Sequence, residues 1–255
     1  MKNIRIFTSL ICISFLLSGC GSHLLIKDSL PVIEKVNQSS KLKAELISKI
    51  KLPKGYHEGI LVGDKTVMVN NGYKIDTWVI DIDSGKVIEK IKPPGTFSEG
   101  ITKGDDGFYY VSDWDKKSLY KCKLEDGHFV VFDSLSLAPS HPTGVTWHDG
   151  ELLVITWTRG MGTKYHLLRI DKNKKIINRY IVSDIREPSQ ICSDGEDIWI
   201  SSWYENKIYK IALRQERIIA EIKLKISKIT GIYVKDKVLW VTGTYADLYR
   251  YEIMD

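Results

Sequence analysis

The sequence predicts an all-β fold, a single five-bladed β-propeller. The first observation behind this prediction is a repeated tripeptide. Glu-Gly-Ile stands at 58–60 and 99–101, and looser copies stand at 143–145, 189–191 and 230–232. The copies begin roughly 41 to 46 residues apart, which is the spacing of propeller blades.

Each repeat also contains up to four strand-like runs, separated by Asp-Gly pairs or by clusters of Asp and Lys that are typical of hairpins. The tripeptides open the first runs. The second runs are 67–69, 109–111, 152–155, 198–200 and 238–241. The third runs are 78–82, 119–122, 166–170, 207–211 and 248–251. The fourth runs are 87–91, 128–132, 176–182 and 217–224, so the fifth repeat lacks its last strand.

The missing strand is available before the first repeat, where residues 44–51 read Ala-Glu-Leu-Ile-Ser-Lys-Ile-Lys. A ring with an open seam would leave an unpaired strand edge. We therefore expect residues 44–51 to supply the outer strand of the last blade. Residues 44–255 would then form one domain.

The first 19 residues resemble a bacterial lipoprotein signal peptide. Lys2 and Arg5 precede an apolar run at 6–17, which is too short to span a bilayer. The string Leu-Ser-Gly-Cys at 17–20 resembles the lipobox, which predicts diacylglycerol and palmitate-type chains on Cys20. Residues 20–43 would be the lipid anchor and a tether, with a short helix over 30–36.

The anchor at Cys20 predicts a place in the cell envelope, with the membrane as a partner. Gly21 rather than Asp follows the cysteine. By analogy with lipoprotein sorting, this favours the periplasmic face of the outer membrane in a Gram-negative cell. In other bacteria the protein would lie on the outer face of the cell membrane.

Charge and cysteine usage narrow the possible functions. The formal charge is only +5 and is dispersed, which argues against a nucleic-acid partner. Cys122 and Cys192 fall in different repeats and inside strand patterns, so we expect two free, buried thiols. No metal-ligand spacing is present, and neither a metal nor a cofactor is predicted.

A candidate pocket follows from propeller geometry. Loops that lead into the first strands emerge on the same face as loops that join the second and third strands. The pocket residues predicted in this way are His57, Glu58, Asn70, Glu99, Asp113, Trp114, His141, Trp157, Trp203 and Tyr245. The glycine-containing loop at 158–163 is the best candidate for a contact loop.

The aromatic and acidic members of this set admit two interpretations each. Trp114, Trp157 and Trp203 occupy equivalent positions, and they either fill the wedges between blades or form an aromatic wall for a ligand. Glu58 and Glu99 either bond a neighbouring backbone or share a proton, bind a cation or perform acid–base chemistry. A catalytic residue, if there is one, would be Glu99 or Glu58.

Several motifs make the chain resemble the plant and bacterial type of glutaminyl cyclotransferase. Tyr-His-Glu-Gly-Ile at 56–60 resembles that family's Phe-Thr-Gln-Gly-Leu, and Phe-Ser-Glu-Gly-Ile-Thr at 97–102 resembles its Phe-Gly-Glu-Gly-Leu/Ile-Thr. Leu-Trp-Val-Thr-Gly at 239–243 is close to its Leu-Phe-Val-Thr-Gly. The resemblance implies a five-bladed propeller that converts N-terminal glutamine to pyroglutamate.

The departures concern the catalytic positions of that family. Val69 stands where the family has a Glu thought to be essential. Glu99, Trp114 and Trp203 carry over as possible pocket residues.

A second resemblance, to gluconolactonase-like and NHL-type propellers, rests on Glu-Gly-Ile at 99–101 and Tyr-Val-Ser-Asp at 110–113. It implies a divalent cation held by Glu58, Asn70 and Asp113.

Three functional hypotheses remain. The first is an anchored, non-catalytic lipoprotein whose propeller face binds a peptide, a protein or a small ligand. The second is a divergent glutaminyl-peptide cyclotransferase. The third is a metal-dependent lactonase or esterase.

Overall fold

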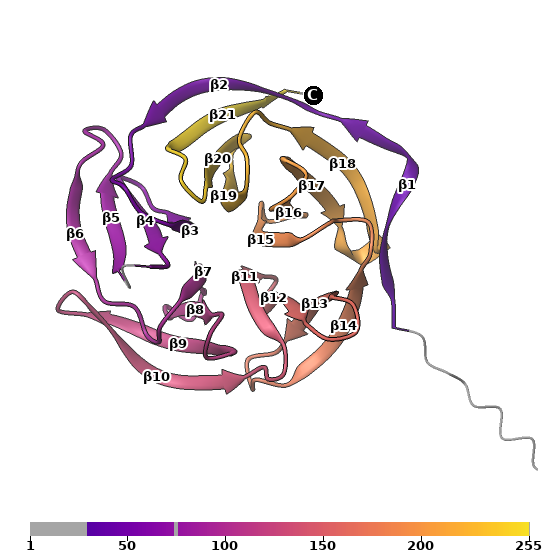
Figure 1. Ribbon diagram of the computed structural model, residues 1–255, viewed down its shortest axis with the longest axis horizontal. Coiled ribbons are helices and arrows are strands. Elements are labelled where there is room, and N and C mark those ends of the chain that lie inside the picture. The colour runs from indigo at the N-terminus through magenta and orange to yellow at the C-terminus, as the bar shows by residue number, and fades with distance from the viewer. Residues whose placement is uncertain (1–29, 74–75, 255) are drawn as a thin grey trace, which may run out of the picture.

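The computed structural model describes residues 30–73 and 76–254, and its strands form blades around a central axis (Figure 1). The predicted signal peptide and Cys20 lie outside the described residues. The all-β propeller class is confirmed. Within the described residues no helix is long and apolar enough to cross a membrane.

Each blade is a four-stranded antiparallel unit whose first strand lies nearest the axis (Figure 1). The first unit is β3 (His57–Val62), β4 (Thr66–Asn71), β5 (Asp76–Asp81) and β6 (Val87–Ile91). The second is β7 (Ser98–Lys103), β8 (Tyr109–Asp113), β9 (Ser118–Glu125) and β10 (His128–Ser136). The third is β11 (His141–His148), β12 (Glu151–Thr158), β13 (Lys164–Ile170) and β14 (Ile176–Val182). The fourth is β15 (Pro188–Ser193), β16 (Ile198–Ser202), β17 (Lys207–Ala212) and β18 (Arg217–Lys223), with a short 3-10 helix, Leu213–Gln215, before β18.

The last unit confirms the predicted closure. It contains β19 (Ile229–Lys235), β20 (Val238–Gly243) and β21 (Leu248–Met254), and β2 (Lys43–Ile50) completes it. β2 is antiparallel to β21, with Lys43 opposite Met254 and Ile50 opposite Leu248. The N-terminal strand therefore pairs the end of the chain and removes the open edge.

The segment before β2 differs from the prediction. Instead of a tether with a short helix over 30–36, β1 (Val32–Lys41) is a strand that pairs in parallel with β14 and with β18. Ile33 explains this placement, because it is fully buried in the core cluster between the third and fourth blades. Burial of such a side chain is worth about 1.5–3 kcal/mol and favours this placement of the strand.

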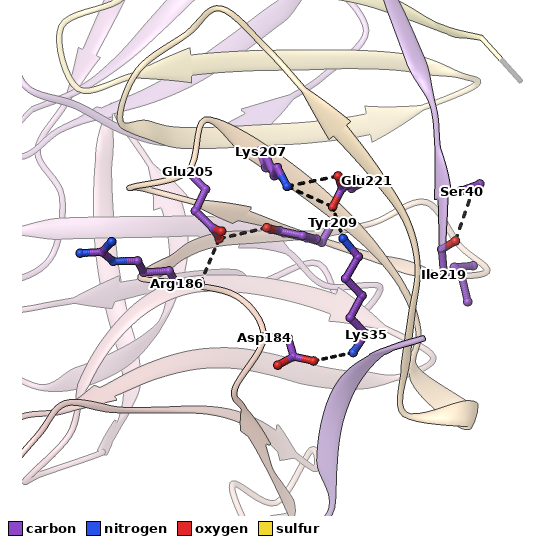
Figure 2. Close-up of polar contacts among 9 residues, drawn as sticks. All are labelled: Lys35, Ser40, Asp184, Arg186, Glu205, Lys207, Tyr209, Ile219 and Glu221. Atoms are coloured by element: carbon purple, nitrogen blue, oxygen red, sulfur yellow. Dashed lines mark hydrogen bonds and ion pairs between the residues drawn. The ribbon is translucent and has the colours of Figure 1, made fainter. Parts of the chain in front are cut away.

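Charged side chains hold β1 against the fourth blade (Figure 2). The Lys35 backbone N–H donates to Asp184 Oδ2 at 2.7 Å, and Lys35 Nζ lies 2.7 Å from Glu221 Oε2. Lys207 Nζ lies 3.1 Å from Glu221 Oε1. Although burial opposes it, the hydrogen bonds from the two lysines hold the pKa of Glu221 below its ordinary value.

Hydrophobic side chains fill the wedges between neighbouring blades. Separate core clusters lie between the first and second, second and third, third and fourth, fourth and fifth, and fifth and first blades. Cys122 belongs to one cluster and Cys192 to another, and both are free and buried, as predicted. Packing between blades is thus the main source of apolar burial.

The recurring glycines bring the first strands into contact around the axis. A Cβ on Gly59 would lie 2.5 Å from the Glu99 carbonyl oxygen, and one on Gly144 would lie 2.6 Å from the Ile191 nitrogen. Real Cβ atoms do not approach backbone so closely, so only glycine fits there. The fourth blade has Gln190 instead, and its Nε2 donates across the centre to the Glu99 carbonyl at 3.2 Å.

We predict that Gly144→Ala lowers the free energy of unfolding by about 2–3 kcal/mol, because backbone atoms of the next blade must move. Chemical denaturation measures the change. Gly160→Ala is the matched control, since a Cβ there would meet nothing within 4 Å. Equal stability of the two variants would contradict the account of central packing.

Candidate functional site

Five equivalent residues, one from each blade, form the floor of a central pocket. Each stands immediately before the central glycine, or before Gln190 in the fourth blade. They are Glu58, Glu99, Thr143, Ser189 and Thr230, and all five line one cavity of about 640 Å³. This size is typical of small-molecule sites. We call these five residues the floor ring.

The three equivalent tryptophans line the same cavity. Trp157 Nε1 donates to the Pro188 carbonyl of the next blade at 2.6 Å, and its ring meets that of Trp114 edge-on, with centroids 5.5 Å apart. Trp157 therefore bridges two blades and also faces the pocket. The packing interpretation is thus confirmed for Trp157, and its role as a wall for a ligand stays a prediction.

Tyrosines and a phenylalanine extend the aromatic surface over the first and last blades. The Tyr56 ring lies 4.5 Å from that of Tyr73, 5.8 Å from that of Phe97 and 5.5 Å from that of Tyr245, centroid to centroid. Tyr73 and Tyr245 are 69% and 71% exposed. Tyr245 lies at the rim and is not among the cavity-lining residues.

Glu58 and Glu99 form a buried carboxyl pair, with exposed fractions of only 2% and 9%. Burial, followed by the charge of Glu99, raises the pKa of Glu58 well above its ordinary value. Burial also raises the pKa of Glu99, to about 8, although the hydrogen bond from Glu58 opposes that rise. Both carboxyl groups of the pair are therefore shifted toward their protonated forms.

The charged residues of the lining are mostly acidic. Asp115 and Glu187 join the carboxyl pair, and Arg159 is the one basic residue among the described lining residues. This balance is the reverse of the whole chain, whose formal charge is +5. The Arg159 guanidinium lies 4.9 Å from the ring centroid of Trp114, and Lys228 Nζ lies 4.6 Å from that of Trp203.

Two predicted pocket residues are occupied in holding the backbone. Asp113 Oδ2 accepts from the backbone N–H groups of Thr96 and Phe97, at 2.5 and 2.8 Å. Asn70 accepts from the Thr77 hydroxyl at 2.7 Å and donates to the Glu99 carbonyl at 3.4 Å. Asp113 and Asn70 therefore do not join Glu58 in a cation site, and the described residues contain no group of three or more His, Cys, Asp or Glu that could hold a metal.

The two predicted histidines lie beside the pocket rather than on its lining. The His57 ring nitrogens lie 2.8 Å from the Ala246 carbonyl and 2.9 Å from the Pro53 carbonyl. His141 Nδ1 lies 3.0 Å from the Trp114 carbonyl, and its ring packs against that indole with centroids 4.5 Å apart. Both histidines position loops around the site.

Phe97 and Asp115 line the pocket but were not predicted from the sequence. Phe97 stands two residues before Glu99, as Tyr56 stands two before Glu58, so alignment of the repeats carries the signal. Its ring packs against Gly72, because a Cβ on Gly72 would lie 2.7 Å from it. Asp115 directly follows Trp114, but Thr158 and Tyr204 follow the two equivalent tryptophans, so the repeats give no signal for an acid there.

We predict that Glu99→Gln weakens the dependence of stability on pH. The folded chain keeps protons that unfolded carboxyl groups release above about pH 4.5, so the free energy of unfolding falls as pH rises toward 8. Removing Glu99 should reduce this slope by up to about 1.4 kcal/mol per pH unit. Chemical denaturation from about pH 5 to about pH 8 measures it.

The matched control is Glu125→Gln, at an exposed site on β9, which should keep the native slope. Parallel curves for the native chain and Glu99→Gln would contradict the raised pKa of the pair.

Comparisons with known proteins support the fold. No protein-family model and no curated protein sequence matches the chain. Among solved structures, glutaminyl cyclase from Myxococcus xanthus is similar, with a TM-score of 0.69 and 12% identity over 85% of this chain and 100% of that chain. Virginiamycin B lyase from Staphylococcus aureus has 21% identity over 80% of this chain and 68% of that one, but its TM-score of 0.47 is too low to support an argument. The chain thus has a β-propeller fold like that of the Myxococcus enzyme.

Proposed function

We propose that this chain is a lipid-anchored envelope protein whose central pocket binds a peptide or a small ligand. The observation that supports binding is the cavity of about 640 Å³, which has a polar floor ring and tryptophan walls. A concave, largely aromatic site with a few converging polar groups is the usual form of a ligand pocket. The raised pKa values of its two buried glutamates are also typical of functional sites.

The anchor belongs to the same proposal and rests on the lipobox-like string at 17–20. The proposed location is the periplasmic face of the outer membrane in a Gram-negative cell, or the outer face of the cell membrane otherwise. Labelling of cells with a palmitate analogue should modify the native chain and not Cys20→Ala. A labelled Cys20→Ala chain, or an unlabelled native chain, would contradict the anchor.

Binding in the pocket is tested by screening the full chain in detergent against a panel of short peptides and amino acids by ligand-observed NMR. Thr96 is exposed and lines the pocket, so Thr96→Trp should obstruct the mouth and abolish binding. Glu125→Trp places the same bulk on an exposed residue at the end of β9, outside the lining and outside the 158–163 loop, and should bind normally. Hits that survive Thr96→Trp, or a panel with no hits, would count against the proposal.

A second candidate function is glutaminyl cyclotransfer, favoured by a buried acid pair on a fold like that of a glutaminyl cyclase. The α-amine of an N-terminal glutamine would attack its own γ-carboxamide carbon and form a lactam. The pair, with one proton on Glu58, would take the amine proton on Glu99 and return the Glu58 proton to the departing ammonia. Val69, which stands where the resembling family has Glu, is fully buried in the core and supplies no third acid.

We predict that, if this second function holds, the full chain releases ammonia from Gln-peptides and Glu99→Gln lowers the rate by about 10²-fold or more. Coupled ammonia detection and mass spectrometry measure turnover. Glu125→Gln should keep the native rate. No turnover by a folded native chain would exclude cyclotransfer and leave the binding proposal in place.

A further inference from the structure

We infer that the central pocket selects ligands that carry a primary ammonium group, which Glu58 and Glu99 would hold at the floor while an apolar part lies against the tryptophans. This inference rests on the proposed binding function and specifies the class of ligand.

An unused acceptor on the floor is the first observation. Glu58 is only 2% exposed, and its buried Oε2 atom has no hydrogen-bond partner among the described residues. The Glu187 Oε2 atom, on the lining of the fourth blade, is likewise buried and without a partner. A buried acceptor left empty costs about 1–3 kcal/mol, which a donor on the ligand would recover. An ammonium group supplies three donors and no acceptor.

The charges that face the floor are the second observation. Asp113 and Asp115 approach Glu99 from the second blade, and Glu187 lies on the lining in the fourth. Tyr56 faces the pair from the loop before β3. Arg159, from the loop after β12, is the one cation among the described lining residues and lies over Trp114 at the wall. The field at the floor therefore favours a cation.

The tryptophan walls are the third observation. Trp114 and Trp203 each already carry a basic group of the protein over the indole ring. Indole faces attract cations by about 0.5–2 kcal/mol, depending on exposure to water. A ligand that joins an ammonium group to an apolar body would satisfy the floor and the walls together.

A simple metal ion fits this site less well than an organic cation. The floor ring does offer two carboxyl groups and three hydroxyl groups, which are ligands that hard cations accept. The cavity of about 640 Å³ is far larger than one ion, however, and much of its lining is aromatic. The size of the cavity and its aromatic lining therefore favour a ligand in which an organic group carries the positive charge.

Binding of an ammonium group should release a proton. The pair is held neutral because burial disfavours its charged form, and a cation placed beside it favours ionisation. Affinity should then increase about tenfold per pH unit below a pKa of about 8 for Glu99. The ammonium group of a simple amine stays protonated in this range, as that of lysine does.

Calorimetry on the full chain in detergent tests the inference with 2-phenylethylammonium and its uncharged twin, 2-phenylethanol. We expect the ammonium to bind at least tenfold more tightly at about pH 8, and its affinity to fall as the pH is lowered toward 6. Phenyltrimethylammonium, a cation without N–H donors, should bind more weakly than the primary ammonium.

Variants separate the roles of the pair and of the pocket. Glu99→Gln should weaken binding of 2-phenylethylammonium at least tenfold, while Glu125→Gln, exposed on β9, should not change it. If Glu99→Gln fails to fold, the pH dependence of the native chain still decides, because affinity that is constant or decreases with pH overturns the inference.

Other outcomes also overturn it. Equal affinity for the alcohol, abolished by Thr96→Trp, would leave ligand binding in place and reject cation selectivity. Equal affinity for phenyltrimethylammonium would assign recognition to the aromatic walls alone. Binding of calcium chloride without binding of the amines would also reject the inference. So would the absence of amine binding at about 10 mM. In both cases the peptide panel would still test whether the pocket binds a ligand at all.

Discussion

The close approach of backbone at the centre of the ring is the constraint on which the rest of the structure depends. Gly59, Gly144 and their equivalents leave no room for a Cβ, so each first strand lies directly against the next. The residue before each glycine, and Ser189 before Gln190, is thereby brought to the floor of the central pocket. The floor ring is a consequence of how the blades meet, and its members need not be close in sequence.

Much of the fold and of the floor ring could be predicted from the sequence, because aligning the repeats shows which residues occupy equivalent positions in the blades. The tripeptide located the first strands, and the strand-like run at 44–51 located the closing strand. β1 was missed because its placement depends on contacts with the third and fourth blades, chiefly the burial of Ile33 and the contacts of Lys35, that the local sequence does not specify. The positions of His57 and Asp113 were also predictable, but the hydrogen bonds that turn their side chains toward backbone depend on loop conformations that no local pattern specifies.

Some side chains both stabilise the packing of the blades and line the central cavity. Trp157 joins two blades through its indole N–H and also presents its ring to the cavity. The carboxyl pair, in contrast, does not stabilise the fold. Because two acids are buried beside each other, the free energy of unfolding falls as the pH rises. Under the proposed function, the carboxyl pair lowers stability at the centre of the ring, where a bound ligand would restore it.

The pairing of β2 with β21 has a consequence for how the molecule forms. These two strands stand at opposite ends of the propeller sequence, so their contact has nearly the largest separation that the chain allows. Such contacts form slowly. Until the seven residues of β21 are present, β2 has no partner, and Leu46 and Ile47, which remain 57% and 48% exposed even in the closed ring, lie on an unprotected strand. A chain made from its N-terminus must therefore carry an aggregation-prone edge through the whole of its synthesis, and truncation at the last strand would make that hazard permanent.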